Sequence, residues 1–480
     1  MSVRGLALAT ARAARLAIPQ VNRPAQLVVS GFAGAVLVGT LLLWLPIATG
    51  GDGHGGASVA SAAFTALFTA VSAVCVTGLV VVDTPGHWST FGEVVILVLI
   101  QVGGFGIMTF ASLLGVLVAR RLGLRAQITA QTETKSLDLG DVRRVLLGVA
   151  STTVVIEVIT AVTLTLRFAF GYGEPAGRAA YLGLFHAVSS FNNAGFALWS
   201  DNLIGFATDP WICLPIAVAV ILGGLGFPVL LEIRRETRAA AGARRRGRRG
   251  RPRPLARWSL HSKITLLTTA VLLTGGTAAI LAGEWTNPAT LGHLGLADKL
   301  LVGFFHAVMP RTAGFNAIDY GQANDATLVV TDVLMFIGGG SAGTAGGIKV
   351  TTFALLGFVI LTEIRGDPET HVFGRTIPVG AQRQALTVAL LSVGLVVLGT
   401  LAVLALSGHE LEPVLFEVTS AFATVGLSTG ITTDLPTSAQ SILVALMFVG
   451  RLGPITLATA LDLRESGRRY QLPEERPIVG

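Results

Sequence analysis

The sequence predicts an all-α polytopic membrane protein, with four repeats of helix, re-entrant pore helix and helix around a pseudo-fourfold central pore. Three observations predict this fold: an apolar composition, apolar stretches of membrane-spanning length, and two glycine landmarks that recur four times. The 480 residues are 52% hydrophobic and 13% charged, compared with ~25% charged residues in an average globular protein. With a mean hydropathy of +0.69, the chain has too few charges to coat a water-facing surface.

Eight apolar stretches are long enough to cross a membrane, because a spanning helix needs about 20 residues. They lie near 27–46, 92–118, 145–170, 211–233, 263–283, 327–364, 380–407 and 437–463. A shorter amphipathic stretch separates the two members of each pair and is too short to cross, so it predicts a re-entrant helix. These short stretches lie near 59–75, 181–192, 297–309 and 412–423.

The distribution of basic residues predicts which side of the membrane each loop occupies. Of the 35 Lys and Arg residues, 29 lie in the two terminal segments and in 120–144, 234–263 and 364–384, whereas the intervening segments carry mostly acids. Cytoplasmic loops keep their Lys and Arg, so we expect both termini in the cytoplasm. The usage rich in Ala, Arg, Gly and Val indicates a GC-rich bacterium, so the expected location is a bacterial plasma (inner) membrane. The net charge of +7 then needs no nucleic acid as a partner, and the basic stretch 234–262 is expected to contact anionic lipid headgroups.

Two glycine landmarks recur in step along the chain. The first is a glycine followed by Leu or Phe at 78, 195, 314 and 426, at spacings of 117, 119 and 112 residues. The second follows after 24 to 28 residues as QVGGFG at 101–106, ILGGLGFP at 221–228, IGGGSAG at 337–343 and VGRLGP at 449–454.

The spans, loops and landmarks together predict the order of segments along the chain. These are a cytoplasmic N-terminus (1–26), repeat 1 (27–118), a cytoplasmic loop (119–144), repeat 2 (145–233), a basic cytoplasmic linker (234–262), repeat 3 (263–364) with an intramembrane gate loop (338–347), a cytoplasmic loop (365–379), repeat 4 (380–463) and a cytoplasmic tail (464–480).

Four such repeats predict a cation pathway. A re-entrant helix that enters from outside points its partly negative C-terminal end at the axis, which favours a cation there. The glycine permits positive φ, so consecutive carbonyls can turn inward. Irregular backbone at membrane depth survives where it is buried in protein or lines a watery cavity, and a ring of carbonyls is how a dehydrated alkali cation is held.

The segments VCVTGL, NNAGF, RTAGF and ATVGL, with GGFG, GGLG, GGGSAGTAGG and GRLGP, resemble those of the Trk/Ktr/HKT superfamily of potassium transporters. The similarity covers about residues 25 to 465, and the eight spans are most like the KtrB membrane subunit branch. The resemblance implies potassium as the transported ion, a homodimer, and a cytosolic KtrA-like nucleotide-binding ring as regulator. It implies no cofactor in this chain, with ATP or ADP on the partner and sodium as a candidate activator.

The resemblance assigns a selectivity filter to four residues of each repeat. These are Val76, Thr77, Gly78 and Leu79; Asn193, Ala194, Gly195 and Phe196; Thr312, Ala313, Gly314 and Phe315; and Thr424, Val425, Gly426 and Leu427. Sodium-selective plant members have serine at the first filter glycine. This chain has Gly78 there, so potassium is the expected ion.

The sixth span predicts a gate. Its 38 residues would make a helix of ~57 Å in a hydrocarbon core of ~30 Å, and it contains GGGSAGTAGG. A broken helix with an obstructing loop is expected, although close helix packing by small residues is an alternative. The expected gate residues are Gly338, Gly339, Gly340, Ser341, Gly343, Thr344, Gly346, Gly347, Lys349 and Arg451. Arg451 stands where the other repeats have glycine, and an intramembrane cation indicates function.

Other polar residues are expected to have structural roles. His186 and His306 are expected to pack or hydrogen-bond behind the filter, while Glu417 at the equivalent place could add a negative field near the ion. Arg311 is expected to pair with a neighbouring acid, and Glu157 needs a polar partner. The chain is not expected to be an enzyme, because the GxGxxG at 338–343 interrupts a span instead of following a strand. A secondary carrier, sodium- or proton-coupled and with broader selectivity for monovalent cations, remains the alternative.

Overall fold

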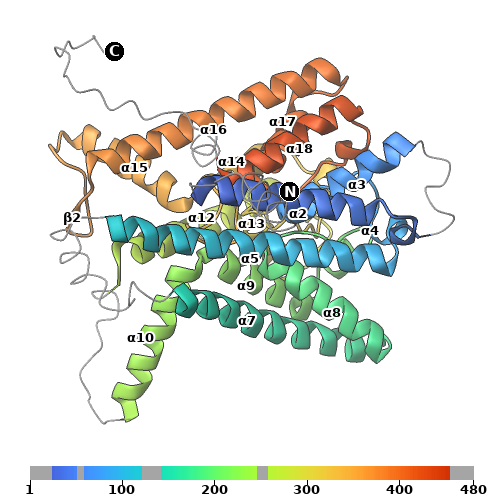
Figure 1. The fold of residues 1–480 in the computed structure, drawn as a ribbon, viewed down its shortest axis with the longest axis horizontal. Helices are drawn as coiled ribbons and strands as arrows, with labels where there is room; N and C mark the ends of the chain where they lie inside the picture. The colour runs from blue at the N-terminus through green and yellow to red at the C-terminus, as the bar shows by residue number, and fades with distance from the viewer. Residues whose placement is uncertain (1–23, 51–58, 122–141, 246–257, 454–480) are drawn as a thin grey trace, which may run out of the picture.

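The computed structural model describes residues 24–50, 59–121, 142–245 and 258–453 (Figure 1). The described residues are mostly helical, so the predicted all-α class is confirmed. The exception is a small antiparallel hairpin of β1 (His371–Val372) and β2 (Arg375–Thr376). The tail 464–480 and parts of the expected N-terminal segment, the loop 119–144 and the basic linker lie outside the described residues.

Each quarter of the chain begins with a long helix and continues with a short one. The first quarter has α2 (Pro24–Leu43), α3 (Val59–Val74), α4 (Thr84–His87) and α5 (Thr90–Arg121). The second has α7 (Val142–Gly171), α8 (Ala176–Phe191), α9 (Pro210–Leu225) and α10 (Phe227–Arg245). The third has α12 (Leu260–Glu284), α13 (Leu296–Val308), α14 (Asp325–Phe336) and α15 (Val350–Arg365), and the fourth has α16 (Val379–Leu406), α17 (Leu411–Ala423) and α18 (Thr437–Leu452). Single 3-10 turns lie at Pro46–Ala48, Ile204–Phe206, Tyr320–Gln322 and Ile431–Thr433.

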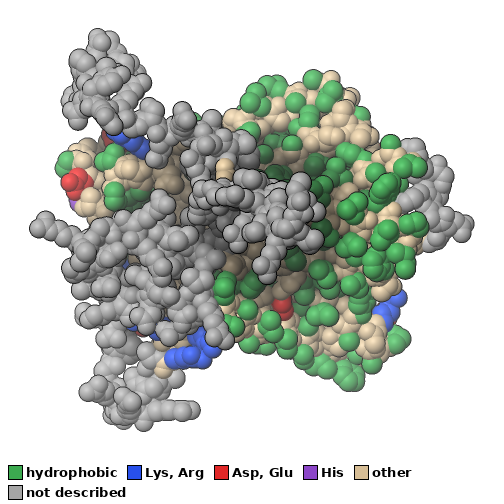
Figure 2. Space-filling view, in the orientation of Figure 1, with side chains coloured by type: hydrophobic (Ala, Val, Ile, Leu, Met, Phe, Trp, Pro, Cys, Tyr) green, Lys and Arg blue, Asp and Glu red, His purple; other side chains and the backbone are tan. Residues whose placement is uncertain are grey.

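The core lies around the short helices, and the apolar surface lies on the long ones. The last turns of α3, α8, α13 and α17 are completely buried. The long helices instead expose large apolar side chains such as Phe170 (86% exposed) and Leu398 (65% exposed). On the described, right-hand part of Figure 2, hydrophobic side chains are abundant and charged ones are few. A surface of this kind suits lipid and not water.

The four quarters contact one another in cyclic order. The helix that follows each short helix packs against the short helix of the next quarter: α5 on α8, α9 on α13, α14 on α17, and α18 back on α3. The last of these contacts joins the end of the described chain to its beginning. The short helices are therefore enclosed in a closed ring of neighbours.

Two of the predicted spanning segments are broken, one of them where no break was predicted. The segment 211–233 ends as α9 at Leu225, and the chain turns by 105° into α10, which leaves the helix bundle in Figure 1. Gly226 has a φ of 90° and ψ of 148°, a conformation reserved for glycine, and Pro228 cannot continue the α9 hydrogen bonds. The third quarter is interrupted between α14 and α15 by residues 337–349, where the glycine run predicted a break. We call residues 337–349 the glycine-rich loop.

Several described helices have the length and apolarity of membrane spans. Three qualify alone, within Leu146–Gly171, Leu260–Glu284 and Val379–Leu406, and α9 with the first part of α10 qualifies as a bent pair. Val28–Leu43, Thr90–Gly106 and Thr437–Leu452 are shorter apolar helices. The eight-crossing topology stays a prediction.

Candidate functional site

The four segments expected to form a filter share one backbone conformation. We call residues 76–79, 193–196, 312–315 and 424–427 the glycine segments. In each segment the first residue and the glycine both have positive φ: 55° and 91°, 61° and 70°, 71° and 69°, and 52° and 94°. A non-glycine residue with positive φ is uncommon, and four of them recur at the same register. This repetition marks a backbone shape that the fold imposes.

The C-terminal end of each short helix holds its glycine segment in place. The amides of Thr77, Ala194 and Val425 donate to the carbonyls of Ser72, Ser189 and Ser420 at 2.7, 2.8 and 2.8 Å. In the third quarter the amide of Ala313 donates to the carbonyl of Met309 at 3.0 Å. These bonds satisfy carbonyls that a helix end leaves without a partner.

The four glycine segments form a closed ring. A Cβ atom added at Gly78 would clash with the carbonyl oxygen of Ala194 in the next segment, and one at Gly195 would clash with that of Ala313. The same relation links the remaining segments, Gly314 to Val425 and Gly426 back to Thr77. Each glycine therefore lets its segment approach the backbone of the next one. The structure brings together all sixteen residues expected in the filter.

A side chain on each of three short helices binds the backbone two residues after the end of a glycine segment. Nε2 of His186 accepts from the amide of Leu198 at 3.3 Å, while Nδ1 lies 2.7 Å from the carbonyl oxygen of Leu182. Nε2 of His306 accepts from the amide of Ala317 at 3.1 Å. These contacts confirm the expected hydrogen bonding of the two histidines.

Glu417 occupies the equivalent place in the fourth quarter. Its carboxylate accepts from the amide of Thr429 at 3.0 Å, the hydroxyl of Ser428 at 2.5 Å and that of Thr432 at 2.7 Å. In all three quarters the amide bound in this way lies three residues after the glycine. A side chain that can accept from a backbone N–H is the shared requirement, which both histidine and glutamate meet.

The second glycine landmark serves close packing. A Cβ atom added at Gly103, Gly223 or Gly450 would clash with the carbonyl oxygens of Val74, Phe191 and Phe422, respectively. Each of these carbonyls lies four residues before the glycine of its own glycine segment. The landmark therefore lets the helix that carries it (α5, α9 or α18) touch the last turn of the short helix of the same quarter, as small residues do in membrane proteins.

The glycine-rich loop docks on the end of α9. The amides of Gly340 and Thr344 donate to the carbonyls of Gly224 and Gly223 at 2.7 and 3.1 Å, and the amide of Phe227 donates to the carbonyl of Ala342 at 3.2 Å. The break at Gly226 frees the α9 carbonyls for the loop, because the last carbonyls of a helix have no partner within it.

The loop also lies against the first residues of the glycine segments. A Cβ atom at Gly346 would clash with the hydroxyl of Thr424, and one at Gly338 would lie 3.4 Å from the methyl group of Thr312. The hydroxyl of Thr344 donates to Oδ1 of Asn193 at 2.9 Å. The loop thus touches three of the four segments at one end of the ring.

Two of the expected gate residues are cations beside the loop. Arg451 is 4% exposed; it donates to the carbonyl of Thr344 and, at 3.3 Å, to that of Gly103. Nζ of Lys349 donates to the carbonyl of Ala345 at 2.5 Å and lies 3.4 Å from that of Gly346. Both cations bind backbone carbonyls of the loop. Lys349 is itself the last residue of the loop, and the other expected gate residues also lie on it: Gly338, Gly339, Gly340, Ser341, Gly343, Thr344, Gly346 and Gly347.

The prediction of an acidic partner for Arg311 is wrong. Within the described ranges its guanidinium bonds to backbone carbonyls instead, to that of Gly338 at 3.1 Å and that of Thr269 at 3.4 Å. Gly338 follows the end of α14 at Phe336, so its carbonyl has no helix partner and can accept from a buried cation without a second charge. Thr269 lies inside α12, and its carbonyl is the longer of the two contacts.

Glu157 has the polar partners that the sequence could not identify. Its carboxylate accepts from Nδ2 of Asn192 at 3.2 Å and lies 3.4 Å from Nε2 of Gln101, while Asn192 also donates to Oε1 of Gln101 at 2.7 Å. This buried network links α5, α7 and the end of α8.

The structure also shows features that sequence reasoning missed. His186, His306 and Glu417 were recognised as equivalent, but their shared partner, the backbone amide three residues after the glycine, was not predicted. The sequence Leu225-Gly226-Phe227-Pro228 is a helix-ending signal that could have located the break. No group of three or more His, Cys, Asp or Glu among the described residues is placed to hold a metal ion.

Comparisons with known proteins agree with this architecture. Residues 39–471 match the family described as TrkH, cation transport protein. The chain is 39% identical over 448 residues to the Ktr system potassium uptake protein B of Bacillus subtilis, covering 93% of this chain and 95% of that protein. It is 35% identical over 468 residues to the potassium/sodium uptake protein NtpJ of Enterococcus hirae, covering 95% and 97%. The crystal structure of the potassium transporter TrkH from Vibrio parahaemolyticus has the same fold, with a TM-score of 0.66 at 19% identity over 90% of this chain and 85% of that one.

Proposed function

The chain belongs to the TrkH family of cation transport proteins, and from that premise we propose that it takes up potassium across a bacterial plasma membrane. The ion passes through a channel-like pore at the centre of the four glycine segments. Their backbone carbonyls form the selectivity filter and bind the dehydrated ion. The named potassium uptake proteins to which the chain is 39% and 35% identical support this substrate.

The closed ring of glycine segments is the observation that carries the proposal. Four segments with the same pair of positive-φ positions surround one centre, and each is attached to the C-terminal end of a short helix. Helix C-termini carry partial negative charge, which favours a cation. Carbonyl oxygens in a ring replace the hydration shell that potassium loses. The geometry thus supplies what a bare cation needs at membrane depth.

The glycine-rich loop and Arg451 are proposed to gate this pore. The loop contacts three of the glycine segments at one end of the ring, where it would obstruct the path of an ion. Arg451 adds a positive charge beside it, which opposes cation passage and also binds the loop through the carbonyl of Thr344. Movement of the loop away from α9 would open the path.

The assembly and its regulation are proposed from the family resemblance. We propose a homodimer in the membrane, a cytosolic KtrA-like ring that binds ATP or ADP, and sodium as an activator. Both termini are proposed to lie in the cytoplasm. The chain itself is proposed to need no cofactor and to catalyse no covalent reaction, since potassium is its cargo.

A carrier of broader selectivity is the second candidate. The relative from Enterococcus hirae is named a potassium/sodium uptake protein, which favours acceptance of more than one monovalent cation, as in a sodium- or proton-coupled carrier. The two candidates differ in ion preference. A carrier of this kind would transport rubidium with similar inhibition by sodium and by potassium.

Uptake of 86Rb into proteoliposomes separates the candidates, with potassium, sodium and lithium as competitors. We expect inhibition by potassium at much lower concentrations than by sodium. Gly78→Ser should reduce that preference, because a side chain there clashes with the Ala194 carbonyl in the ring. Equal inhibition by sodium would favour the carrier. Absence of uptake, both alone and with an added KtrA-like ring, would contradict the proposal.

A further inference from the structure

Asn193, the first residue of the second glycine segment, and Arg311, the residue before the third, both bind the glycine-rich loop. We propose that these residues, Asn193 and Arg311, are positioning residues that hold the second and third glycine segments to the loop, so that displacing the loop changes the ion preference of the ring. This inference rests on the proposed pore and gate and adds a link between them. The loop then controls which cation is accepted as well as whether the path is open.

Asn193 links the loop to its own glycine segment and to the residue that precedes the third. Its Oδ1 accepts from the hydroxyl of Thr344 on the loop at 2.9 Å, and its Nδ2 lies 3.4 Å from the backbone carbonyl oxygen of Arg311. Asn193 and Thr344 are both about 1% exposed, so water cannot replace either partner. Since Asn193 begins the second segment with a φ of 61°, a change at its side chain acts directly on that backbone.

Arg311 makes a second connection on the other side of the loop. Its guanidinium donates to the carbonyl of Gly338, where the loop begins, at 3.1 Å, and lies 3.4 Å from that of Thr269 on α12. The next residue, Thr312, begins the third segment. The loop is therefore tied to the second segment through Thr344 and to the third through Gly338. Both ties are hydrogen bonds, which are directional and break within a small displacement.

The other two segments have no comparable side-chain tie among the described residues. Val76 begins the first segment and has an apolar side chain that cannot form one. Thr424 begins the fourth, and its hydroxyl is buried without a hydrogen-bond partner in the described chain, as is that of Thr312. The link between loop and ring is therefore asymmetric. A displaced loop would disturb the second and third segments first.

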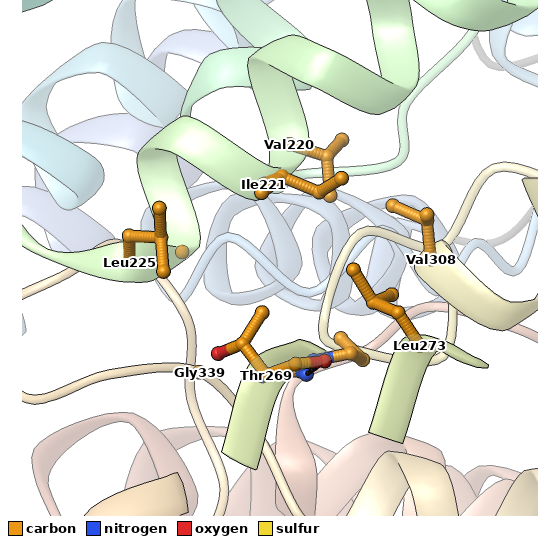
Figure 3. A pocket seen from close by; sticks show the side chains of 9 residues that line it. Val220, Ile221, Leu225, Thr269, Leu273, Val308 and Gly339 are labelled. Carbon is orange, nitrogen blue, oxygen red and sulfur yellow. Dashed lines mark hydrogen bonds between the residues drawn. The ribbon is translucent and has the colours of Figure 1, made fainter. Parts of the chain in front are cut away.

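The space beside Arg311 is consistent with a link made by hydrogen bonds. A cavity of about 20 Å³ lies between α9, α12 and the loop, lined by Arg311, Thr269 and Gly339 among others (Figure 3). About one water molecule fits in such a space. The sticks in Figure 3 show Val220, Ile221 and Leu225 on the opposite wall. Close packing is thus incomplete there, and the bonds of Arg311 add to the backbone bonds that hold the loop on α9.

The test measures ion preference in a variant that removes the hydroxyl of Thr344, which donates to Oδ1 of Asn193 at 2.9 Å and lies 3.3 Å from the carbonyl oxygen of Phe191. Thr344→Val keeps the branched shape and loses the hydroxyl donor, and Thr344→Ser keeps the donor and loses a methyl group. For each full-length variant in proteoliposomes, 86Rb uptake is titrated with sodium and with potassium. The quantity compared is the half-inhibitory concentration of sodium divided by that of potassium, which is high when the protein prefers potassium. We expect Thr344→Val to lower this ratio about fivefold, the effect of one net hydrogen bond, and Thr344→Ser to keep it near that of the unmodified chain.

Arg311→Gln supplies an independent variant on the third segment. It removes the bond to Gly338 without leaving a buried charge, and we expect it to lower the ratio as well. A purely structural role would reduce the amount of well-inserted protein or the uptake rate and leave the ratio unchanged. Faster uptake with an unchanged ratio in both variants would overturn the link but leave the proposed pore and gate intact. Failure of the unmodified chain to prefer potassium would overturn the proposed function and this inference with it.

Discussion

Helices α5 and α9 occupy the same place in the first and second quarters, yet only one of them is continuous. Both contain two adjacent glycines, at 103–104 and at 223–224, and both place the first of these against a carbonyl of a short helix. Nevertheless α5 runs to Arg121, whereas α9 ends at Leu225 and the chain turns by 105°. The shared glycines therefore serve packing, and they do not break a helix by themselves.

The difference lies two residues further along the chain. In α9 the pair is followed by Gly226, with positive φ, and then by Phe227 and Pro228; α5 has Gly106 at the matching place with no proline after it. The fourth quarter repeats the α9 pattern, since α18 ends at Leu452 before Gly453, with a φ of 83°, and Pro454. A glycine with a nearby proline ends the helix. The comparison separates a glycine needed for contact from one needed for a turn.

The largest loss of stability is expected at the packing glycine that α5 and α9 share. Gly103→Ala places a methyl group on the Val74 carbonyl oxygen, a backbone atom that cannot move alone, and we expect a loss of about 3 kcal/mol or more of stability. Thermal unfolding of the purified protein in detergent measures it. The matched control is Gly106→Ala on the same helix, where the nearest neighbour is 3.7 Å away on the ring of Phe32. Alanine has a higher helix propensity than glycine, so a control as unstable as Gly103→Ala would contradict the explanation by contact.

The second prediction concerns Gly226, the position at which α9 ends and α5 continues. Gly226→Ala combines an unfavourable backbone conformation with a clash against the carbonyl of Ser341 on the loop. We expect the loop to leave its site on α9 and 86Rb uptake to rise more than tenfold, because strain of ~1–3 kcal/mol at the turn would be added to the clash.

Gly173→Ala is the control for Gly226→Ala. Gly173 also has positive φ, 71°, but open space where the Cβ atom would lie, so it isolates the backbone strain. Unchanged uptake in both variants would mean that the turn at Gly226 does not support the loop.

A smaller effect is expected at the end of α18. Arg451 stands where α9 has Gly224, and it joins the loop to α5 through the carbonyls of Thr344 and Gly103. Arg451→Gln removes a buried charge and a charge-assisted bond, so we expect uptake to rise about tenfold. Uptake kinetics in correctly inserted protein measure the change. Kinetics equal to those of the unmodified chain would contradict the role of Arg451 in gating.

The smallest effect concerns a polar network that α5 has and α9 lacks. Gln101 on α5, where α9 has Ile221, lies with Asn192 beside Glu157. Glu157→Gln keeps one acceptor and should lower stability by about 1 kcal/mol. Glu157→Leu removes both acceptors, although Nδ2 of Asn192 keeps its bonds to Gln101 and Val188, and should cost about 2 kcal/mol. Thermal unfolding distinguishes the two variants. An equal loss in both would mean that the volume of residue 157, and not its hydrogen bonds, matters.

Some of the site was predictable because it depends on patterns along the chain. The register of the four glycine segments follows from Gly78, Gly195, Gly314 and Gly426, because a left-handed or closely packed position excludes most other residues. The interruption between α14 and α15 follows from the run at 338–347. The partners of Arg311 were not predictable. The sequence shows a cation next to a filter segment, but the carbonyls that it binds lie 27 and 42 residues away along the chain.

The sequence by itself determined the helical class, the apolar surface, the fourfold recurrence and the positions of the glycines. These depend on composition and local spacing, which physical chemistry converts directly into helices, turns and burial. Only the tertiary structure decided that the glycine segments close on one another, that the loop docks on the broken end of α9, and that Arg311 and Arg451 bind carbonyls and not acids. Unpaired carbonyls appear wherever a helix ends, and which side chain reaches them depends on contacts between residues more than a hundred positions apart, such as Arg451 and Thr344.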